Sequence, residues 1–173
     1  MKVKVSDGDL RRAASEGMDA FVKVFVDALR KAIGGELSQD TLPMLGSDQI
    51  TLLVWDSLHT EMMDGGMIQL IHNGYGPLLW FNPTEKAFRM WSAEEGCGSL
   101  KELVKFIKKG RTPFMKRRDD IERDCTDDEF MALYEQMPEF DDYDDFFVSN
   151  EEEWTRAVAT YIDNHIDNFA EIE

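Results

Sequence analysis

Apolar residues recur every three or four positions along most of this chain, which is the spacing of one face of an α-helix. The first such stretch runs over residues 9–33 and ends at Gly34-Gly35, so we expect an N-terminal helix that glycine closes. A second helix should begin near Ser47, after a loop at 38–46 that has room for one helical turn. Beyond the first five residues, no segment shows the strict alternation typical of a strand.

Further helix starts are marked by capping residues. Asn82-Pro83 stand before Glu85, which predicts an asparagine cap with proline at the first helical position. A Ser or Thr followed three residues later by Glu forms a capping box, and three of these precede helical apolar patterns: Ser99 with Glu102, Thr126 with Glu129, and Ser149 with Glu152. The pattern predicts an all-α, compact single-domain bundle of about six to eight helices. No repeat or long linker divides residues 1–173.

Composition supports a folded core, since 43% of the residues are hydrophobic and 11% are aromatic. No apolar run approaches the roughly 20 residues that span a bilayer, and the first residues contain no hydrophobic signal core. We therefore expect a soluble, cytoplasmic protein without membrane contact. Cys97 and Cys125 belong to no C-x-x-C pair, and we expect two reduced thiols.

The net charge of -16 is distributed very unevenly. Residues 1–118 hold 17 of the 19 Lys and Arg and 15 of the 35 Asp and Glu, a net charge of +2. Residues 119–173 hold 2 basic and 20 acidic residues, a net charge of -18. Such a field repels nucleic acid and anionic membrane and attracts basic partners. The basic run 101–118 is therefore expected to face acid within the molecule or across a dimer, and direct binding to nucleic acid is not expected.

The segment "EFDDYDDFF" (139–147) concentrates this acid and interleaves it with aromatic rings. A bare acidic run is typical of a disordered tail, but the rings indicate an anchored segment. We expect Phe140, Phe146, Phe147 and Trp154 to be buried. The acidic face that this arrangement would present to a partner consists of Asp141, Asp142, Asp144, Asp145, Glu151 and Glu152.

The segment "LHTEMMDGGMIQLIHNGYG" (58–76) places two adjacent glycines in a helical context, where each costs roughly 1 kcal/mol relative to alanine. Two explanations fit: a helix break with Asp64 capping a new helix, or close approach by a neighbouring helix. Polar residues four apart could hydrogen-bond loop backbone from inside the fold, so Gln69 and Asn73 are expected to be largely buried. Asn73-Gly74 should end the helix.

The same segment resembles the bacterial family named after a neisserial DNA-mimic protein. The matching residues are Glu61, Gly65, Gly66, Gln69, Asn73 and Gly76, and the resemblance extends over about 47–172 through "NPTEKAFRMW", "TDDEFMALYEQ" and "YIDNHIDNFAEI". It implies an all-α domain in which these six residues form a structural motif. From the named member it further implies a homodimer whose acidic surface imitates duplex DNA and occupies a basic, helix-turn-helix regulator of transcription.

Catalytic and metal-binding motifs are weak in this chain. His59, Glu61 and His72 lack the partners of H-E-x-x-H and zinc deaminase motifs, and the glycines lack the G-K-[ST] ending of a phosphate loop. We therefore expect no catalytic residues, no metal and no cofactor.

The leading hypothesis is an acidic, non-enzymatic protein-interaction domain that mimics DNA for a basic DNA-binding protein. A non-mimic scaffold or regulator whose acidity serves solubility is the alternative, and a hydrolase or metal-binding enzyme is the third.

Overall fold

The computed structural model describes all 173 residues and contains ten α-helices, two 3₁₀ turns and one pair of short parallel strands. Eight of the helices have seven or more residues, so the predicted all-α bundle is confirmed. In chain order the elements are β1 (Lys4–Val5), α1 (Asp7–Glu16), α2 (Met18–Ile33), η1 (Leu42–Met44), α3 (Ser47–Asp64), α4 (Gly66–His72), α5 (Gly76–Trp80), α6 (Thr84–Ser92), α7 (Leu100–Glu122), α8 (Asp127–Gln136), η2 (Pro138–Phe140), α9 (Asp141–Asn164), α10 (Ile166–Phe169) and β2 (Glu171–Ile172).

The helix α3 is the centre of the core. It packs against α2, α4, α6, α9 and α10, and Leu52, Leu53 and Leu58 are almost completely buried. The predicted start at Ser47 is confirmed, and the expected single turn before it is η1. A helix enclosed by neighbours on several sides needs apolar residues around much of its circumference, which is why its pattern is less one-sided than that of α2.

The predicted continuous helix over 9–33 is wrong, because the chain breaks into α1 and α2 at Gly17. Gly17 has a φ of 139°, a conformation that residues with a Cβ rarely adopt. Ser6 caps α1 by accepting a hydrogen bond from the Asp9 backbone N–H. The closing glycine was predicted correctly, since Gly34 takes a left-handed conformation at the end of α2.

The capping predictions had mixed outcomes. The Thr126–Glu129 box is confirmed in both of its hydrogen bonds. Ser99 instead donates its hydroxyl to the Glu153 carbonyl, and Asn82 donates its amide to the Pro77 carbonyl, so neither side chain caps its helix. The third box fails because α9 begins at Asp141, which places Ser149 in the helix interior, where it donates to the Asp145 carbonyl.

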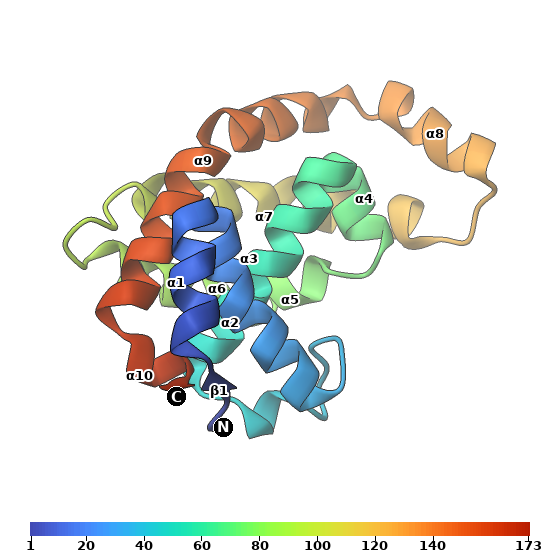
Figure 1. Cartoon of the computed structure of the whole chain (residues 1–173). Helices are drawn as coiled ribbons and strands as arrows, with labels where there is room; N and C mark the ends of the chain where they lie inside the picture. The colour runs from blue at the N-terminus through green and yellow to red at the C-terminus, as the bar shows by residue number, and fades with distance from the viewer.

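The acidic third of the chain follows one edge of the molecule (Figure 1). The helix α8 lies at the outer end, the loop before it turns the chain back, and α9 then runs from that end across the body to the other side (Figure 1). The helix α9 packs against α2, α3 and α7. Beyond α9 the chain returns to its beginning, where β2 pairs with β1 and brings Lys4 opposite Glu171. None of the helices combines the length and apolarity that a bilayer-spanning segment needs.

Candidate functional site

The aromatic residues of the acidic segment divide between two environments. Phe140, Phe147 and Trp154 are buried as predicted, each within 1% of complete burial. They lie seven residues apart, which is close to two helical turns and places them in one line along the segment. The prediction for Phe146 is wrong: its side chain is 40% exposed, because it lies next to Phe147 on the helix and points toward α7 at the rim of the core.

The predicted acidic face is only partly exposed. Asp141, Asp142, Asp145 and Glu152 are exposed and take part in no ion pair. Glu151 is instead half-buried, and its carboxylate lies 2.9 Å from the His59 Nε2 atom. The predicted face is therefore corrected at Glu151, which connects α9 to α3, and at the aspartate described next.

Asp144 points into the protein, contrary to the prediction that it faces water. Its Oδ1 accepts a hydrogen bond of 2.8 Å from the backbone N–H of Met67, in the first turn of α4. Burial raises the pKa of Asp144 to about 6, and the neighbouring charges of Asp141 and Asp145 add to the rise although the Met67 bond opposes it. Asp144 thus connects the acidic helix to α4 and is not part of the exposed face.

This raised pKa makes the stability contribution of Asp144 dependent on pH. The native carboxyl binds its proton more tightly than the unfolded one, whose pKa is about 3.9, so its contribution is largest below pH 4 and falls as pH rises through 6. We expect the free energy of unfolding of the wild type to fall relative to Asp144→Asn by on the order of 1 kcal/mol between pH 4 and 7, after allowing for solvent screening. Urea unfolding across this range measures the difference, with Asp142→Asn as the exposed control on the same helix. A difference that stays constant with pH would contradict the assignment.

The glycine pair is the point at which the acidic third contacts α4. Asp144 from α9 lies so close to Gly66 that a Cβ there would be 2.4 Å from its Oδ2 atom, and Gly66 has a φ of +75°. Tyr134 from α8 donates its hydroxyl to the Gly65 carbonyl over 2.7 Å. Both proposed explanations therefore hold in part, because the helix breaks here and a neighbouring helix approaches closely. Asp64 does not cap α4, since the Met67 N–H in the first turn donates to the Asp144 carboxylate instead.

The remaining motif residues hold the turn around this pair. Glu61 accepts hydrogen bonds from Gln69 at 3.1 Å and from Asn73 at 2.8 Å, and Gln69 also donates to Asp64. The predicted burial of the two amides is wrong: Gln69 is half-buried and Asn73 is exposed, and their partners are carboxylates instead of backbone groups. Asn73 ends α4, as predicted.

Gly76 has a separate role in the motif. A Cβ at this position would lie 2.2 Å from the ring of Phe114, a fully buried residue of α7. Glycine therefore allows the start of α5 to approach α7 closely.

The contact of Tyr134 with Gly65 was not predicted from the sequence. The spacing of Phe130 and Tyr134, four residues apart, nevertheless indicates an inward-facing aromatic edge on α8.

The basic run in α7 is partly neutralised within the chain. Arg117 pairs with Glu139 at 2.6 Å, Lys105 with Glu102 at 2.7 Å, and Arg118 with Glu122 at 3.2 Å. Other cations of this run are exposed without an ionic partner: Lys101, Lys108, Lys109, Arg111 and Lys116. The expectation that this run faces acid within the molecule is therefore met by three pairs only.

The three residues considered for a metal site each have a different hydrogen-bond partner. His59 bonds to Glu151, the His72 Nδ1 atom lies 2.7 Å from the Ile121 carbonyl oxygen, and Glu61 binds the two amides described above. The structure brings together no group of three His, Cys, Asp or Glu side chains suited to an ion. Cys97 and Cys125 are unpaired.

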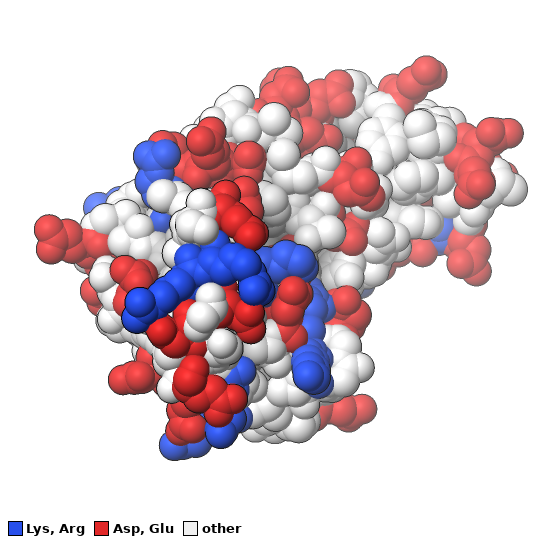
Figure 2. All heavy atoms as spheres, in the orientation of Figure 1, with Lys and Arg blue, Asp and Glu red and all other residues white.

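The surface charge agrees with the course of the acidic third. In Figure 2 the end of the molecule that α8 forms shows red and uncoloured spheres with very little blue, while Lys and Arg form a band across the opposite part of this face. The exposed carboxylates at this end and along α9 include Asp127, Asp128, Glu129, Glu135, Asp141, Asp142, Asp145 and Glu152. The exposed charge at this end is therefore predominantly negative.

Comparison with known proteins gives the same assignment as the motif. The family model described as DMP19-like protein matches residues 44–165. The DNA mimic protein DMP19 of Neisseria meningitidis serogroup B is 26% identical over 138 residues, which cover 79% of each of the two chains. The matched region contains the glycine pair, Tyr134 and the acidic segment of α9. This chain belongs to the DMP19-like protein family.

Proposed function

We propose that this protein acts without catalysis, by presenting carboxylates in place of DNA phosphates to the DNA-binding surface of a basic protein. The observation that carries the proposal is the way α9 is fixed: one side of the helix is buried through Phe140, Phe147 and Trp154, and Asp144 ties its first turn to α4. The exposed carboxylates are therefore held in place before a partner arrives. A partner that binds a fixed array loses less conformational entropy than one that must order a flexible tail.

The charge density indicates how much surface the partner must cover. From Asp141 to Glu152 the helix rises about 16 Å at 1.5 Å per residue. Duplex DNA would carry about ten charges over that length, at one per roughly 1.7 Å, whereas the exposed face of α9 carries Asp141, Asp142, Asp145 and Glu152. The first turn of α8, with Asp127, Asp128 and Glu129, must therefore contribute for the imitation to approach the field of DNA.

Neutralising the exposed face should weaken binding strongly while the fold is kept. In Asp141→Asn/Asp142→Asn/Asp145→Asn/Glu152→Gln we expect at least about a tenfold loss of affinity and a shallower dependence on salt, because fewer counterions exchange on binding. Partners are captured from native cytosol on the immobilised wild type, and affinity is then measured for the purified partner with and without duplex DNA as competitor.

The matched control removes four exposed carboxylates elsewhere: Glu16→Gln, Asp40→Asn, Glu95→Gln and Asp163→Asn. This variant should bind as the wild type does, and both variants should keep its melting temperature within a few degrees. Equal binding by the two variants, or failure of DNA to compete, would contradict mimicry. The acid would then serve solubility alone, as in a scaffold protein.

A further inference from the structure

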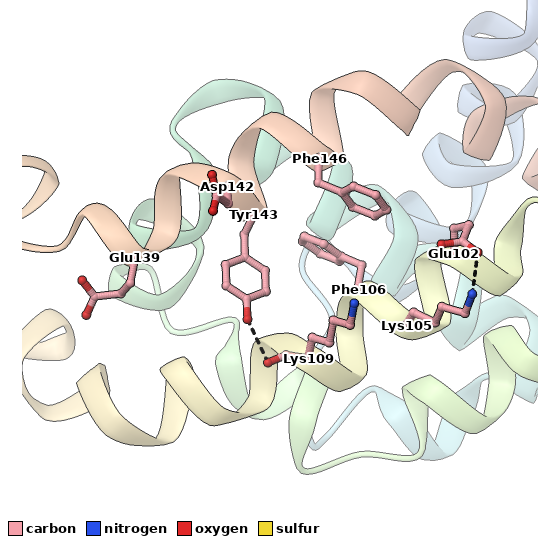
Figure 3. Close-up of a pocket in the computed structure, with 8 residues that line it drawn as sticks. All are labelled: Glu102, Lys105, Phe106, Lys109, Glu139, Asp142, Tyr143 and Phe146. Atoms are coloured by element: carbon pink, nitrogen blue, oxygen red, sulfur yellow. Dashed lines mark hydrogen bonds and ion pairs between the residues drawn. The ribbon is translucent and has the colours of Figure 1, made fainter.

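A groove of about 340 Å³ lies between α7 and the first half of α9, at the edge of the acidic face. Figure 3 shows its two sides: Tyr143, Phe146, Asp142 and Glu139 come from the α9 side, and Phe106 and Lys109 come from α7. Its volume is within the range that accommodates small ligands and single large side chains. It adjoins the exposed carboxylates, so a partner on the acidic face would also cover the groove.

The groove has one exposed aromatic wall, Phe146, which packs on the buried ring of Phe106. The rings of Phe146 and Phe106 are nearly parallel, with an interplanar angle of 15° and a centroid distance of 6.4 Å. Tyr143 presents its ring to Phe106 at 6.1 Å, and its hydroxyl donates to the Lys109 carbonyl over 3.2 Å (Figure 3). Phe146 leaves part of a large apolar ring in water, which loses favourable burial energy. A charged face that serves only solubility does not need such an exposed ring.

The charged groups of the groove fall into paired and unpaired sets. Lys105 is paired with Glu102, and Glu139 is paired with Arg117 at one end of the groove. Lys109 and Asp142 have no ionic partner, and the Lys109 side chain extends beside Phe106 (Figure 3). The groove therefore offers aromatic surfaces, one free ammonium on the α7 side and one free carboxylate on the α9 side.

We propose that this groove receives an aromatic side chain of the basic partner, next to an arginine or lysine that pairs with Asp142. The inserted ring would pack against Phe146 and Tyr143, and the Lys109 ammonium would approach its face in a cation–π contact. An aromatic ring of the partner is a suitable neighbour for the unpaired Lys109 ammonium, whereas a second basic residue of the partner would be repelled by it. This inference rests on the proposed function, and it adds to the charge contacts of the acidic face a contact with an aromatic side chain of the partner.

The test uses two synthetic arginine-rich helical peptides that differ at one central position, which is tryptophan in one and alanine in the other. Fluorescence anisotropy at low salt and at about 0.3 M salt measures their affinity for the wild-type protein, since charge contacts are screened at the higher concentration. We expect the wild type to prefer the tryptophan peptide by about tenfold, and the preference to persist at high salt. Equal affinity for the two peptides would overturn the proposal.

Two groove variants should remove the preference for the tryptophan peptide without weakening the binding of the alanine peptide. Phe146→Ala removes one wall of the groove. Lys109→Ala removes the ammonium and leaves the apolar walls intact. The second variant therefore still tests the proposal if Phe146→Ala disturbs the fold. Val148→Ala, at a residue that is 54% exposed on the same helix and outside the groove, is the matched control and should keep the preference. A preference that survives both groove variants would equally overturn the proposal.

The variant with four neutralised carboxylates separates this inference from the proposed function. It should weaken both peptides. If both peptides weaken but the wild type shows no preference for tryptophan, the groove inference fails and mimicry stands. If both peptides bind as tightly as they bind to the wild type, the proposed function fails.

Discussion

Gly66→Ala should destabilise the protein by about 3–4 kcal/mol. Part of this cost is the left-handed conformation at φ +75°, which is worth roughly 1–2 kcal/mol for a residue with a Cβ. The rest comes from the new methyl group, which would lie 2.4 Å from Asp144 Oδ2 and displace the carboxylate from the Met67 N–H. A hydrogen bond to a charged group contributes roughly 1.5–3 kcal/mol. Urea unfolding measures the loss.

Gly74→Ala is the matched control for Gly66→Ala. Gly74 has a similar φ of +84°, but a Cβ there would meet nothing within 4 Å, so only the backbone strain of roughly 1–2 kcal/mol should appear. The additional cost at Gly66 should shrink when Asp144 is also changed to serine, because the two positions are in contact and their effects are not additive. Equal costs at the two glycines would show that the Asp144 contact contributes nothing.

Phe147→Ala should cost about 3–5 kcal/mol, the range for removal of a fully buried phenylalanine. Its ring contacts Trp55 at a centroid distance of 6.2 Å, Phe106 at 5.6 Å and Trp154 at 5.3 Å, so truncation opens a cavity between α3, α7 and α9. Denaturant unfolding measures the stability. Partner affinity should fall in the same variant even though no charge is removed, because a loosened α9 no longer holds its carboxylates in place.

Val148→Ala, one residue further along α9, is the control for this prediction. Its side chain is 54% exposed, and its loss should change the free energy of unfolding by no more than about 0.5 kcal/mol. If Phe147→Ala unfolds as the control does, the buried line of aromatic residues does not anchor the acidic helix. If stability falls but partner affinity is unchanged, the carboxylates do not need a rigid support.

The fold class could be predicted because apolar periodicity is a local signal that most of these helices carry. The breaks were harder to predict. Gly17 interrupts the N-terminal pattern without changing its phase, so periodicity continues across a point where the backbone turns. Ser149 with Glu152 matches a capping box that the chain does not use, because η2 starts α9 two turns earlier. A cap depends on where the helix starts, and tertiary packing decides that.

The candidate site could be located from the sequence, but its exposed and buried residues could not all be told apart. Charge counting identified the acidic segment, and the rings interleaved with its carboxylates predicted the burial of Phe140 and Phe147. Helical spacing places Asp144 on the buried side, since it lies four residues after Phe140 and three before Phe147, but its contact with Met67 depends on the approach of α4. The exposure of Phe146 likewise depends on the path of α7. Contacts between elements remote in the chain are absent from a local pattern.

The pairing of β1 with β2 determines how the protein can be handled. Because Lys4 lies opposite Glu171, both chain ends emerge together, on the side of the molecule away from α8 (Figure 1). An affinity tag or fluorescent protein fused to either end would leave the α8 end free toward solution. Adjacent ends are also the geometry that allows one domain to be inserted into a surface loop of another. The whole protein could thus be carried in a host loop as a genetically encoded block of negative charge.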